Sequence, residues 1–149
     1  MWLVTGANGQ LGQELKRMSG IDAVYVNRYQ LDISDEKAVK SYLEKNEFDG
    51  IINCAAYTAV DRAEDEPEKA DKTNHLGPQW LARYGKCIIH ISTDYVFDGI
   101  SHVPYSESDQ TNPVSVYGKT KLAGERAVLE EADTAIIIRT AWLYSLCGH

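Results

Sequence analysis

The sequence lacks the features that mark membrane and secreted proteins. None of its apolar runs approaches the roughly 18 residues that a membrane span requires. The first residues enter an apolar stretch with no basic leader and no cleavage signal. We therefore expect a soluble, cytoplasmic protein with no membrane partner.

Positive charge is also scarce. The 149 residues contain 15 Lys and Arg against 22 Asp and Glu, which gives a net charge of −7 at pH 7. A protein that binds the phosphate backbone of nucleic acids needs a clustered Lys/Arg surface. We therefore expect no nucleic-acid partner.

Cysteine is limited to Cys54, Cys87 and Cys147. Their odd number, the absence of a CxxC spacing and the absence of an adjacent histidine pair argue against a zinc site. We interpret all three as buried, reduced thiols, and we predict no metal site from the sequence.

What the sequence does contain is a series of short apolar runs rich in Ile and Val, most of them too short for helices. The runs are nearly continuous rather than alternating, which is typical of parallel strands covered by helices on both faces. The sequence predicts strands over 2–4, 23–26, 50–56, 87–91 and 135–138.

Helical spacing of apolar residues lies between these strands. Ser34 precedes two acidic residues and is predicted to cap a helix that runs to Asn46. A longer helix is predicted over 114–131, started by Asn112 and Pro113. Alternating strands and helices predict a single α/β domain, a doubly wound parallel sheet of the Rossmann type.

The first predicted strand runs directly into GANGQLG, residues 6–12, which precedes a predicted helix over 13–18. In this GxxGxxG spacing Gly6 permits a tight turn, Gly9 lets the backbone approach a pyrophosphate, and Gly12 lets the helix pack close to the strand. The amides at the start of the helix would face the anion. The loop therefore predicts a dinucleotide cofactor, although a tight turn with no ligand would use glycine in the same way.

The end of the second predicted strand indicates which dinucleotide binds. A carboxylate there would hold the adenosine ribose of NAD, but the sequence has Asn27 and Arg28. Because an arginine can pair with a 2′-phosphate, we predict NADPH, with NADH as the alternative. Arg28 could also be only a solvated surface charge, and Asp32 either lies beside the adenine or ends a loop.

Tyr117 and Lys121 are four residues apart on the long predicted helix, so their side chains share one face. An ammonium near a phenol favours the phenolate and should lower the Tyr117 pKa from about 10, so that Tyr117 can give a proton to a carbonyl oxygen during reduction. Lys121 can also bind the nicotinamide ribose. A YxxxK spacing alone is weak evidence, because Tyr/Lys pairs are common on helix surfaces.

Thr93 supplies the context that the Tyr/Lys pair needs. It lies in STDYVF, residues 92–97, at the end of the fourth predicted strand, where open parallel sheets bind their ligands. Its hydroxyl can hydrogen-bond a substrate carbonyl and stabilise the charge that develops on oxygen as hydride arrives. Thr93, Tyr117 and Lys121 therefore form the predicted catalytic set.

Five segments occur in one order along the chain: GANGQLG, NCAAYTAVD, STDYVF, VYGKTKLAGE and RTAWLY. Together they resemble the dTDP-4-dehydrorhamnose reductase family of extended short-chain dehydrogenases/reductases. The resemblance implies that NAD(P)H reduces the 4-keto group of dTDP-4-dehydro-6-deoxy-L-mannose, a nucleotide sugar, to dTDP-L-rhamnose for polysaccharide biosynthesis. It identifies Thr93, Tyr117 and Lys121 with the family's catalytic triad, and it suggests a homodimer.

The same resemblance assigns binding residues. Those expected at the cofactor are Gly6, Asn8, Gly9, Gln10, Leu11, Gly12, Arg28, Asp32, Ile33, Ala55, Ala56, Tyr57, Tyr117 and Lys121. Those expected around the deoxysugar are Thr58, Val60, Tyr95 and Trp142, although Val60 and Trp142 could pack in the core and Tyr95 could be a rim aromatic.

Asn74 matches an asparagine near the superfamily's active site, or is a structural amide inside a helix. Glu14 resembles a glutamate with which some relatives bind Mg²⁺, but a single carboxylate is weak evidence for a metal.

Two further features bear on function. Sugar-nucleotide dehydratases carry Asp-Glu where this chain has Asp94-Tyr95, so we expect reduction rather than dehydration. A non-catalytic regulatory subunit resembling the β subunit of methionine adenosyltransferase would share the fold and motifs, and it is the alternative function.

Because the family continues well beyond the RTAWLY segment, we expect residues 1–149 to form the dinucleotide-binding domain, with the substrate domain missing after His149. For the same reason we expect little turnover.

Overall fold

The computed structural model describes residues 1–18 and 20–145. Its strands are β1 (Trp2–Thr5), β2 (Ala23–Val26), β3 (Gly50–Asn53), β4 (Cys87–Thr93) and β5 (Thr134–Thr140). They form one sheet in the order β2-β1-β3-β4-β5, and every neighbouring pair is parallel. The predicted α/β fold with a doubly wound parallel sheet is confirmed. β3 ends at Asn53 rather than at 56, whereas β4 and β5 are longer than predicted.

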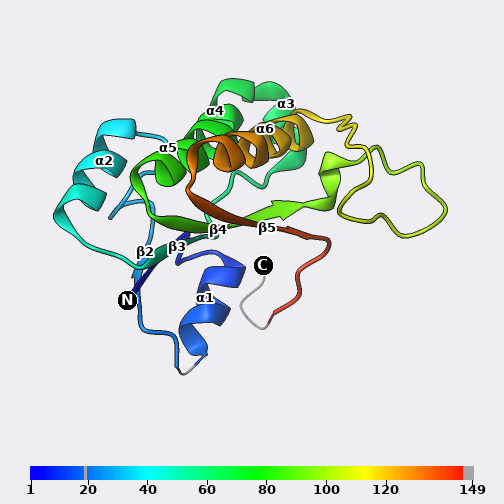
Figure 1. Cartoon of the computed structure of the whole chain (residues 1–149). Helices are drawn as coiled ribbons and strands as arrows, with labels where there is room; N and C mark the ends of the chain where they lie inside the picture. Colours follow the sequence, from blue (N-terminus) through cyan, green and yellow to red (C-terminus); the bar gives the residue numbers. More distant parts are fainter. Residues whose placement is uncertain (19, 146–149) are drawn as a thin grey trace.

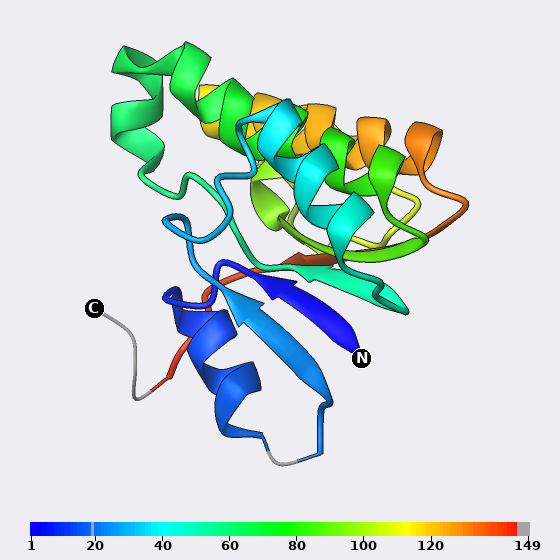
Figure 2. The ribbon, with the colours of Figure 1, turned by 90° about the vertical axis from the view of Figure 1, so that its left-hand side faces the viewer.

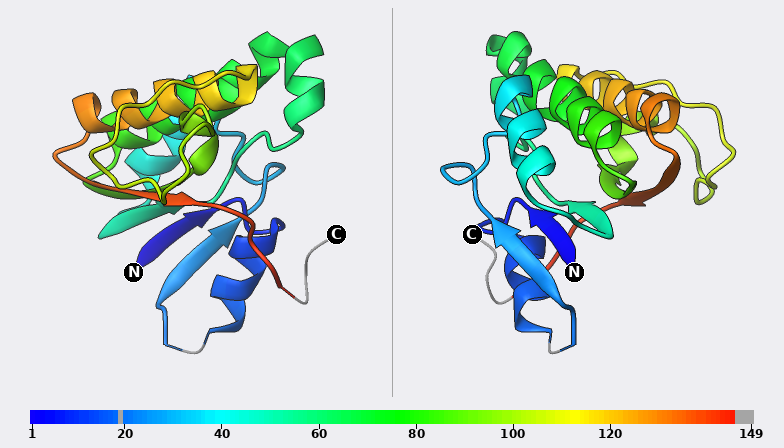
Figure 3. Two further views of the ribbon diagram at one scale, coloured as in Figure 1. Left: turned by 90° about the vertical axis from the view of Figure 1, so that its right-hand side faces the viewer. Right: turned by 60° about the vertical axis from the view of Figure 1, so that its left-hand side comes forward.

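Helices cover the two faces of the sheet unequally. One layer contains α2 (Glu36–Lys45), α3 (Val60–Asp65), α4 (Pro67–Asp71), the π-helix η1 (Lys72–Leu76), α5 (Gly77–Tyr84) and α6 (Val116–Glu131). Within the described part of the chain, α1 (Gln10–Arg17) is the one helix on the opposite face, as Figures 1 and 2 show. A short 3-10 helix, η2 (Asp94–Val96), follows β4, and the segment between η2 and α6 is a long loop beside the helix layer (Figure 3).

β5 departs from the prediction that the strands are covered on both faces. Its side chains alternate in burial, and Ile136 and Ile138 are exposed. Because side chains alternate between faces along a strand, these two point away from α6, which packs near Ile137. Among the described residues no helix covers this part of the sheet, so the prediction was wrong for β5.

The starts of two helices also differ from the prediction. Asp35, not Ser34, caps α2, and its carboxylate accepts hydrogen bonds from two first-turn amides at 2.9 and 3.2 Å. Ser34 instead donates to the carboxylate of Asp32 at 2.7 Å. Similarly, α6 begins at Val116, because Ser115 accepts from the Gly118 amide. Adjacent residues that can all cap a helix make such boundaries hard to predict.

The cysteines are less buried than predicted. Cys54, just after β3, and Cys87, at the start of β4, are free and only partly buried. The prediction for Cys147 falls outside the described residues.

The main core lies between the sheet and the larger helix layer. Leu3, Ile51 and Ile88 come from neighbouring strands and pack with Leu81 of α5 and Val128 of α6, all nearly fully buried. This packing holds β1, β3 and β4 in register, so that their carboxyl ends meet along one edge of the sheet. In residues 1–18 and 20–145, no helix combines the length and apolar character that a bilayer span needs.

Candidate active site

The strand order reverses between β1 and β3, and the candidate site lies at that reversal. β2 lies on one side of β1, whereas β3, β4 and β5 lie on the other. Open parallel sheets bind ligands outside the carboxyl ends of their strands at such a switch point. The glycine loop leaves β1 there, and the segment of Cys54 to Tyr57 leaves β3 there.

Two of the three loop glycines are required by close backbone packing. Gly6 has a φ of +70°, and a Cβ on it would lie 2.6 Å from the backbone nitrogen of Ala55. A Cβ on Gly12 would lie 2.4 Å from the carbonyl oxygen of Gly6. Gly9 differs, because the nearest atom to its Cβ would be 3.3 Å away. Gly6 and Gly12 therefore allow the loop to fold, while a Cβ on Gly9 would make one slightly tight contact, with the carbonyl oxygen of Gly6.

The start of α1 offers donors to an anion. The helix begins at Gln10 rather than at 13, and its N-cap, Gly9, provides no side-chain acceptor. The first-turn amides of a helix have no partners within the helix, and the helix dipole adds partial positive charge at this end. The loop and α1 together therefore present the phosphate-binding arrangement that the glycine spacing predicts.

Two cavities meet at this loop. The first, of about 260 Å³, lies on the β2 side, and the second, of about 560 Å³, lies on the β4 side. The predicted residues that line the β2-side cavity are Gly6, Asn8, Gly9, Arg28, Asp32, Ile33, Ala55, Ala56 and Tyr57. Those that line the β4-side cavity are Asn8, Gly9, Gln10, Leu11, Ala56, Thr58, Val60, Thr93, Tyr95, Tyr117, Lys121 and Trp142. Gly12 lines neither cavity because it is buried beneath the loop.

Thr93, Tyr117 and Lys121 come together in the β4-side cavity. Thr93 is the last residue of β4, while Tyr117 and Lys121 lie one turn apart near the start of α6. Tyr117 is 8% exposed and Lys121 is 1% exposed. The structure therefore places the predicted catalytic set at one wall of a cavity, although these residues are distant in sequence.

The pKa of Tyr117 does not shift in the predicted direction. Burial raises it above the ordinary value of a tyrosine, Asp94 and Tyr95 add to the rise, and a hydrogen-bonding interaction with Thr93 opposes it. The expected lowering by Lys121 is wrong for this structure, because burial is the largest influence on the phenol and Lys121 is not among the groups that lower its pKa. Tyr117 is therefore a protonated phenol at neutral pH, which is the form that can give a proton.

Lys121 is a buried ammonium with a weakened hold on its proton. Its Nζ donates to the carbonyl oxygen of Ile91 at 2.6 Å. Burial lowers its pKa to about 8, while Glu125 and Cys54 act to raise it. Because an ammonium has three donor protons, Lys121 can hold a ligand hydroxyl in the cavity while it keeps the contact with Ile91.

Cys54 lines both cavities but is not a nucleophile. Burial raises the pKa of its thiol to about 12, against an opposing effect of Lys121. Since the reactive form of cysteine is the thiolate, Cys54 is a neutral, apolar part of the cavity wall.

Asn74 is a structural amide rather than a cavity residue. It is fully buried in η1, and its side chain accepts from the amide of Tyr57 at 2.8 Å and donates to the carbonyl of Tyr57 at 3.0 Å. It also donates to the hydroxyl of Thr120 on α6 at 3.2 Å. Asn74 therefore fixes the segment after β3 onto α6. Of its two interpretations, the contacts support the structural one.

The residues predicted around the deoxysugar all line the β4-side cavity. Tyr95 is 43% exposed, and its ring packs edge-on against Tyr117 with centroids 5.4 Å apart. Trp142 is 82% exposed, so its core-packing alternative is wrong. Val60 is partly buried against the apolar cluster of Tyr117, and it therefore both packs and lines the cavity.

A chain of buried polar groups lies beneath the site, and it was not predicted from the sequence. The hydroxyl of Thr5 donates to Asn53 Oδ1 at 2.7 Å, and Asn53 Nδ2 lies 3.0 Å from His90 Nδ1. Asn53 Oδ1 also accepts from the amide of Ala55 at 3.2 Å, which ties the start of the cavity wall to the sheet. Burial lowers the His90 pKa well below its usual value, so the ring is neutral. The β1-β3-β4 register, which the sequence does not reveal, brings these residues together.

Comparison with known proteins gives a consistent picture. Residues 1–149 match the family model described as RmlD substrate binding domain. The chain is 48% identical to a dTDP-4-dehydrorhamnose reductase from Streptomyces griseus, over 99% of this chain and 51% of the relative. It is 45% identical to a dTDP-4-dehydrorhamnose reductase from Mycolicibacterium smegmatis, over 95% of this chain and 45% of the relative.

Solved structures are similar to the chain over the same extent. A dTDP-4-dehydrorhamnose reductase from Clostridium acetobutylicum has a TM-score of 0.93 and 44% identity, covering 97% of this chain and 54% of that one. A dTDP-4-dehydrorhamnose reductase from Bacillus anthracis in complex with NADP has a TM-score of 0.92 and 37% identity, covering 96% and 53%. The chain thus spans about half the length of the curated relatives it matches.

Proposed function

The chain belongs to the RmlD substrate-binding domain family, and on that basis we propose that it forms the dinucleotide-binding domain of an NADPH-dependent dTDP-4-dehydrorhamnose reductase. The reaction would reduce the 4-keto group of dTDP-4-dehydro-6-deoxy-L-mannose to give dTDP-L-rhamnose. The observation that carries this proposal is the placement of Thr93, Tyr117 and Lys121 in a cavity that continues, past the glycine loop, into a second cavity lined by Arg28. The names of the relatives support it.

The two cavities fit the two halves of a dinucleotide. In this proposal the adenosine occupies the β2-side cavity beside Asp32 and Ile33, and the pyrophosphate lies over Gly9 at the start of α1. The nicotinamide then occupies the β4-side cavity with Tyr117 and Lys121. An NADP-bound structure among the similar proteins supports this choice of cofactor. NADH, which lacks the 2′-phosphate, is the alternative.

The proposed chemistry assigns one task to each catalytic side chain. When bound, the cofactor supplies the hydride that reaches the keto carbon. The Thr93 hydroxyl donates a hydrogen bond to the keto oxygen, and Tyr117 transfers its phenolic proton to that oxygen as negative charge develops. Lys121 would hold the ribose hydroxyls of the bound cofactor, since its ammonium has donor protons beyond the one given to Ile91. The product is a hydroxyl group, with one hydride and one proton added across the carbonyl.

Protonation of Tyr117 before the reaction is important for this scheme. A phenol with a pKa raised by burial keeps its proton until a basic oxygen forms next to it. Tyr95 occupies the position where dehydratases carry a glutamate, and its ring packs against Tyr117. Among the described residues that line the cavity, Asp94 is therefore not followed by a second carboxylic acid that could help to eliminate water, which favours reduction over dehydration.

Three further expectations rest on the family resemblance, and we keep them as proposals. A homodimer, a cytoplasmic location and a nucleotide-sugar substrate are typical of such a biosynthetic reductase. Glu14, which resembles a glutamate that binds Mg²⁺ in some relatives, forms an ion pair with Arg17 at 3.4 Å, and we propose no metal there. The non-catalytic regulatory alternative is not favoured, because the relatives above are named as reductases and the side chains of the catalytic set lie together.

A single-turnover experiment tests the proposed function. The chain, in excess over NADPH, is mixed with the dTDP-4-ketosugar, and both the loss of NADPH absorbance and the sugar product are followed. We expect slow formation of dTDP-L-rhamnose matched by NADPH oxidation, because this chain spans only about half the length of its relatives. dTDP-glucose, which has no keto group, is the control and should leave NADPH unchanged. A chain that fails to bind NADPH, or that oxidises NADPH without forming dTDP-L-rhamnose, would rule the proposal out.

A further inference from the structure

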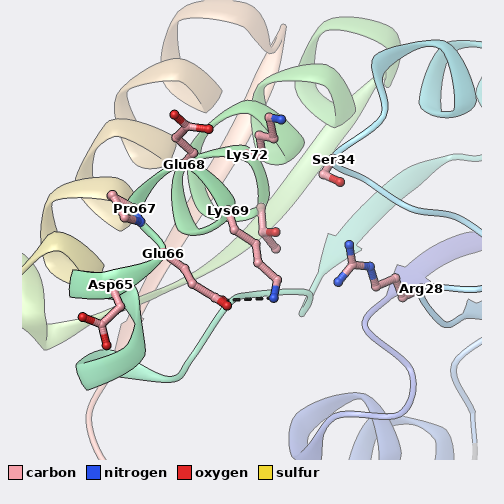
Figure 4. A pocket seen from close by; sticks show the side chains of 9 residues that line it. Arg28, Ser34, Asp65, Glu66, Pro67, Glu68, Lys69 and Lys72 are labelled. Carbon is pink, nitrogen blue, oxygen red and sulfur yellow. Dashed lines mark hydrogen bonds and ion pairs between the residues drawn. The ribbon is translucent and has the colours of Figure 1, made fainter.

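A third cavity adjoins the β2-side cavity and has no part in the proposed chemistry. Its volume is about 590 Å³, and it lies between the segment after β2 and the helices α3, α4 and η1 (Figure 4). It shares Arg28 and Thr73 with the β2-side cavity. A group that extends from a ligand in the β2-side cavity past Arg28 would therefore enter the third cavity.

Two cations lie on opposite sides of this third cavity. Figure 4 shows Arg28, from the segment after β2, and Lys69, from α4, extending toward one another. Lys69 also lies over the ring of Tyr57, with Nζ 5.6 Å from the ring centroid, and Tyr57 lines the β2-side cavity. Lys69 is thus positioned at the boundary between the two cavities. Lys72 lines the third cavity as well, but its ammonium extends away from Arg28 in Figure 4.

Both cations already form ion pairs, and these pairs are exposed to solvent. Arg28 pairs with Asp32 at 3.2 Å, Lys69 pairs with Glu66 at 3.0 Å, and all four side chains are more than a third exposed. Ion pairs this exposed contribute little to stability. A phosphate group can bind an arginine through two parallel hydrogen bonds. Such a group can therefore replace Asp32 as the partner of Arg28, and it can share the Lys69 ammonium with Glu66.

The negative charges of the third cavity are not centred between the two cations. Asp65 and Glu68 extend away from Arg28 in Figure 4, and Glu66 is the carboxylate beside Lys69. Glu66 is held in place because it accepts a hydrogen bond from the Tyr57 hydroxyl at 2.7 Å. The space between Arg28 and Lys69 is therefore open to an anion that approaches from the β2-side cavity.

We propose that Lys69 is a specificity-determining residue for the cofactor, which holds the 2′-phosphate of NADPH together with Arg28. This inference rests on the proposed function and adds a residue that neither the glycine loop nor the family resemblance assigns. The ligand group is a phosphate monoester on the adenosine ribose. Arg28 provides a planar, bidentate contact, and Lys69 provides a single point charge from the opposite side. NADH carries no phosphate at that position and would contact neither cation in this way.

Calorimetric titration of NADP⁺ and NAD⁺ tests this role. Lys69→Gln should weaken NADP⁺ binding roughly fivefold, as expected for one charged contact at a partly exposed site, and should leave NAD⁺ binding unchanged. Arg28→Gln should weaken NADP⁺ binding by tenfold or more, on the order of a bidentate charged contact. Lys72→Gln is the matched control, because it removes the same charge from the same cavity without facing Arg28, and it should change neither affinity.

The outcomes separate this inference from the proposed function. Unchanged NADP⁺ affinity in Lys69→Gln, or equal weakening of both dinucleotides, overturns the role of Lys69 while NADP⁺ binding itself stands. No binding of NADP⁺ by the unsubstituted chain overturns the proposed function as well. Inorganic phosphate, titrated alone, should bind far more weakly than NADP⁺. Binding as tight as that of NADP⁺ and dependent on Lys69 would show a site for free anions instead.

Discussion

Replacing Tyr117 by Phe is expected to slow the single-turnover reduction of the ketosugar by roughly 10²- to 10⁴-fold, the usual contribution of a positioned general acid. The substitution removes the one phenolic proton that the proposed reaction transfers. It keeps the ring that packs against Tyr95 and against the buried cluster of Ala63 and Ala70. The fold and the cavity should therefore persist, and NADPH affinity should change little. Rapid-mixing measurements of NADPH oxidation, with dinucleotide titration alongside, check both parts.

A second tyrosine provides the control for this substitution. Tyr84 ends α5, and its hydroxyl donates to Glu36 at 2.8 Å, away from both cofactor cavities. Tyr84→Phe removes the same hydroxyl and should leave the reduction rate unchanged. If Tyr117→Phe kept a rate within a few fold of the unsubstituted chain while binding NADPH normally, Tyr117 could not be the proton donor.

Gly12→Ala is expected to lower the free energy of unfolding by about 3 kcal/mol, at the upper end of the range for overpacked sites. The added Cβ would lie 2.4 Å from the carbonyl oxygen of Gly6 and 2.8 Å from the Cα of Ala7. Both are backbone atoms, so no side chain can rotate away to make room. Urea denaturation followed by circular dichroism measures the loss.

Gly9→Ala separates folding from binding at the same loop. Gly9 has a φ of −75°, which any residue adopts, and its added Cβ would approach no backbone atom closer than 3.3 Å. That contact is only slightly tight, so the free energy of unfolding should fall by about 1 kcal/mol, well below the loss in Gly12→Ala. The new methyl group would occupy the space proposed for the pyrophosphate, so NADP⁺ affinity should fall. A large loss of stability in Gly9→Ala, or unimpaired cofactor binding, would contradict the roles assigned to these two glycines.

The features that could be predicted from the sequence are local and periodic. The strands are short runs of Ile and Val, and the glycine loop is a contiguous spacing, so neither depends on distant residues. The helices α3, α4 and η1 could not be predicted from the sequence, because they are short and follow one another within 60–76, a segment rich in charge. Their place in the fold depends on long-range contacts such as that of Asn74 with Thr120.

In the candidate site, too, local features could be predicted from the sequence, whereas features that depend on long-range packing could not. The sequence predicts that Thr93, Tyr117 and Lys121 act together, and the structure places all three at one cavity. The direction of the Tyr117 pKa shift could not be predicted, because it depends on how deeply the phenol is buried and on the groups beside it. The position of Lys69 opposite Arg28 across the third cavity could not be predicted from the sequence either. It depends on the packing of α4 beside the segment that follows β2.

A crystal structure of this chain with NADP⁺ would show where the dinucleotide binds. We expect the adenosine in the β2-side cavity, the pyrophosphate over Gly9 at the start of α1, and the nicotinamide in the β4-side cavity. The nicotinamide ribose should lie within hydrogen-bond distance of Lys121 Nζ, with the nicotinamide ring next to Tyr117. NADP⁺ bound outside these two cavities, or bound with its nicotinamide beside Arg28, would contradict the account.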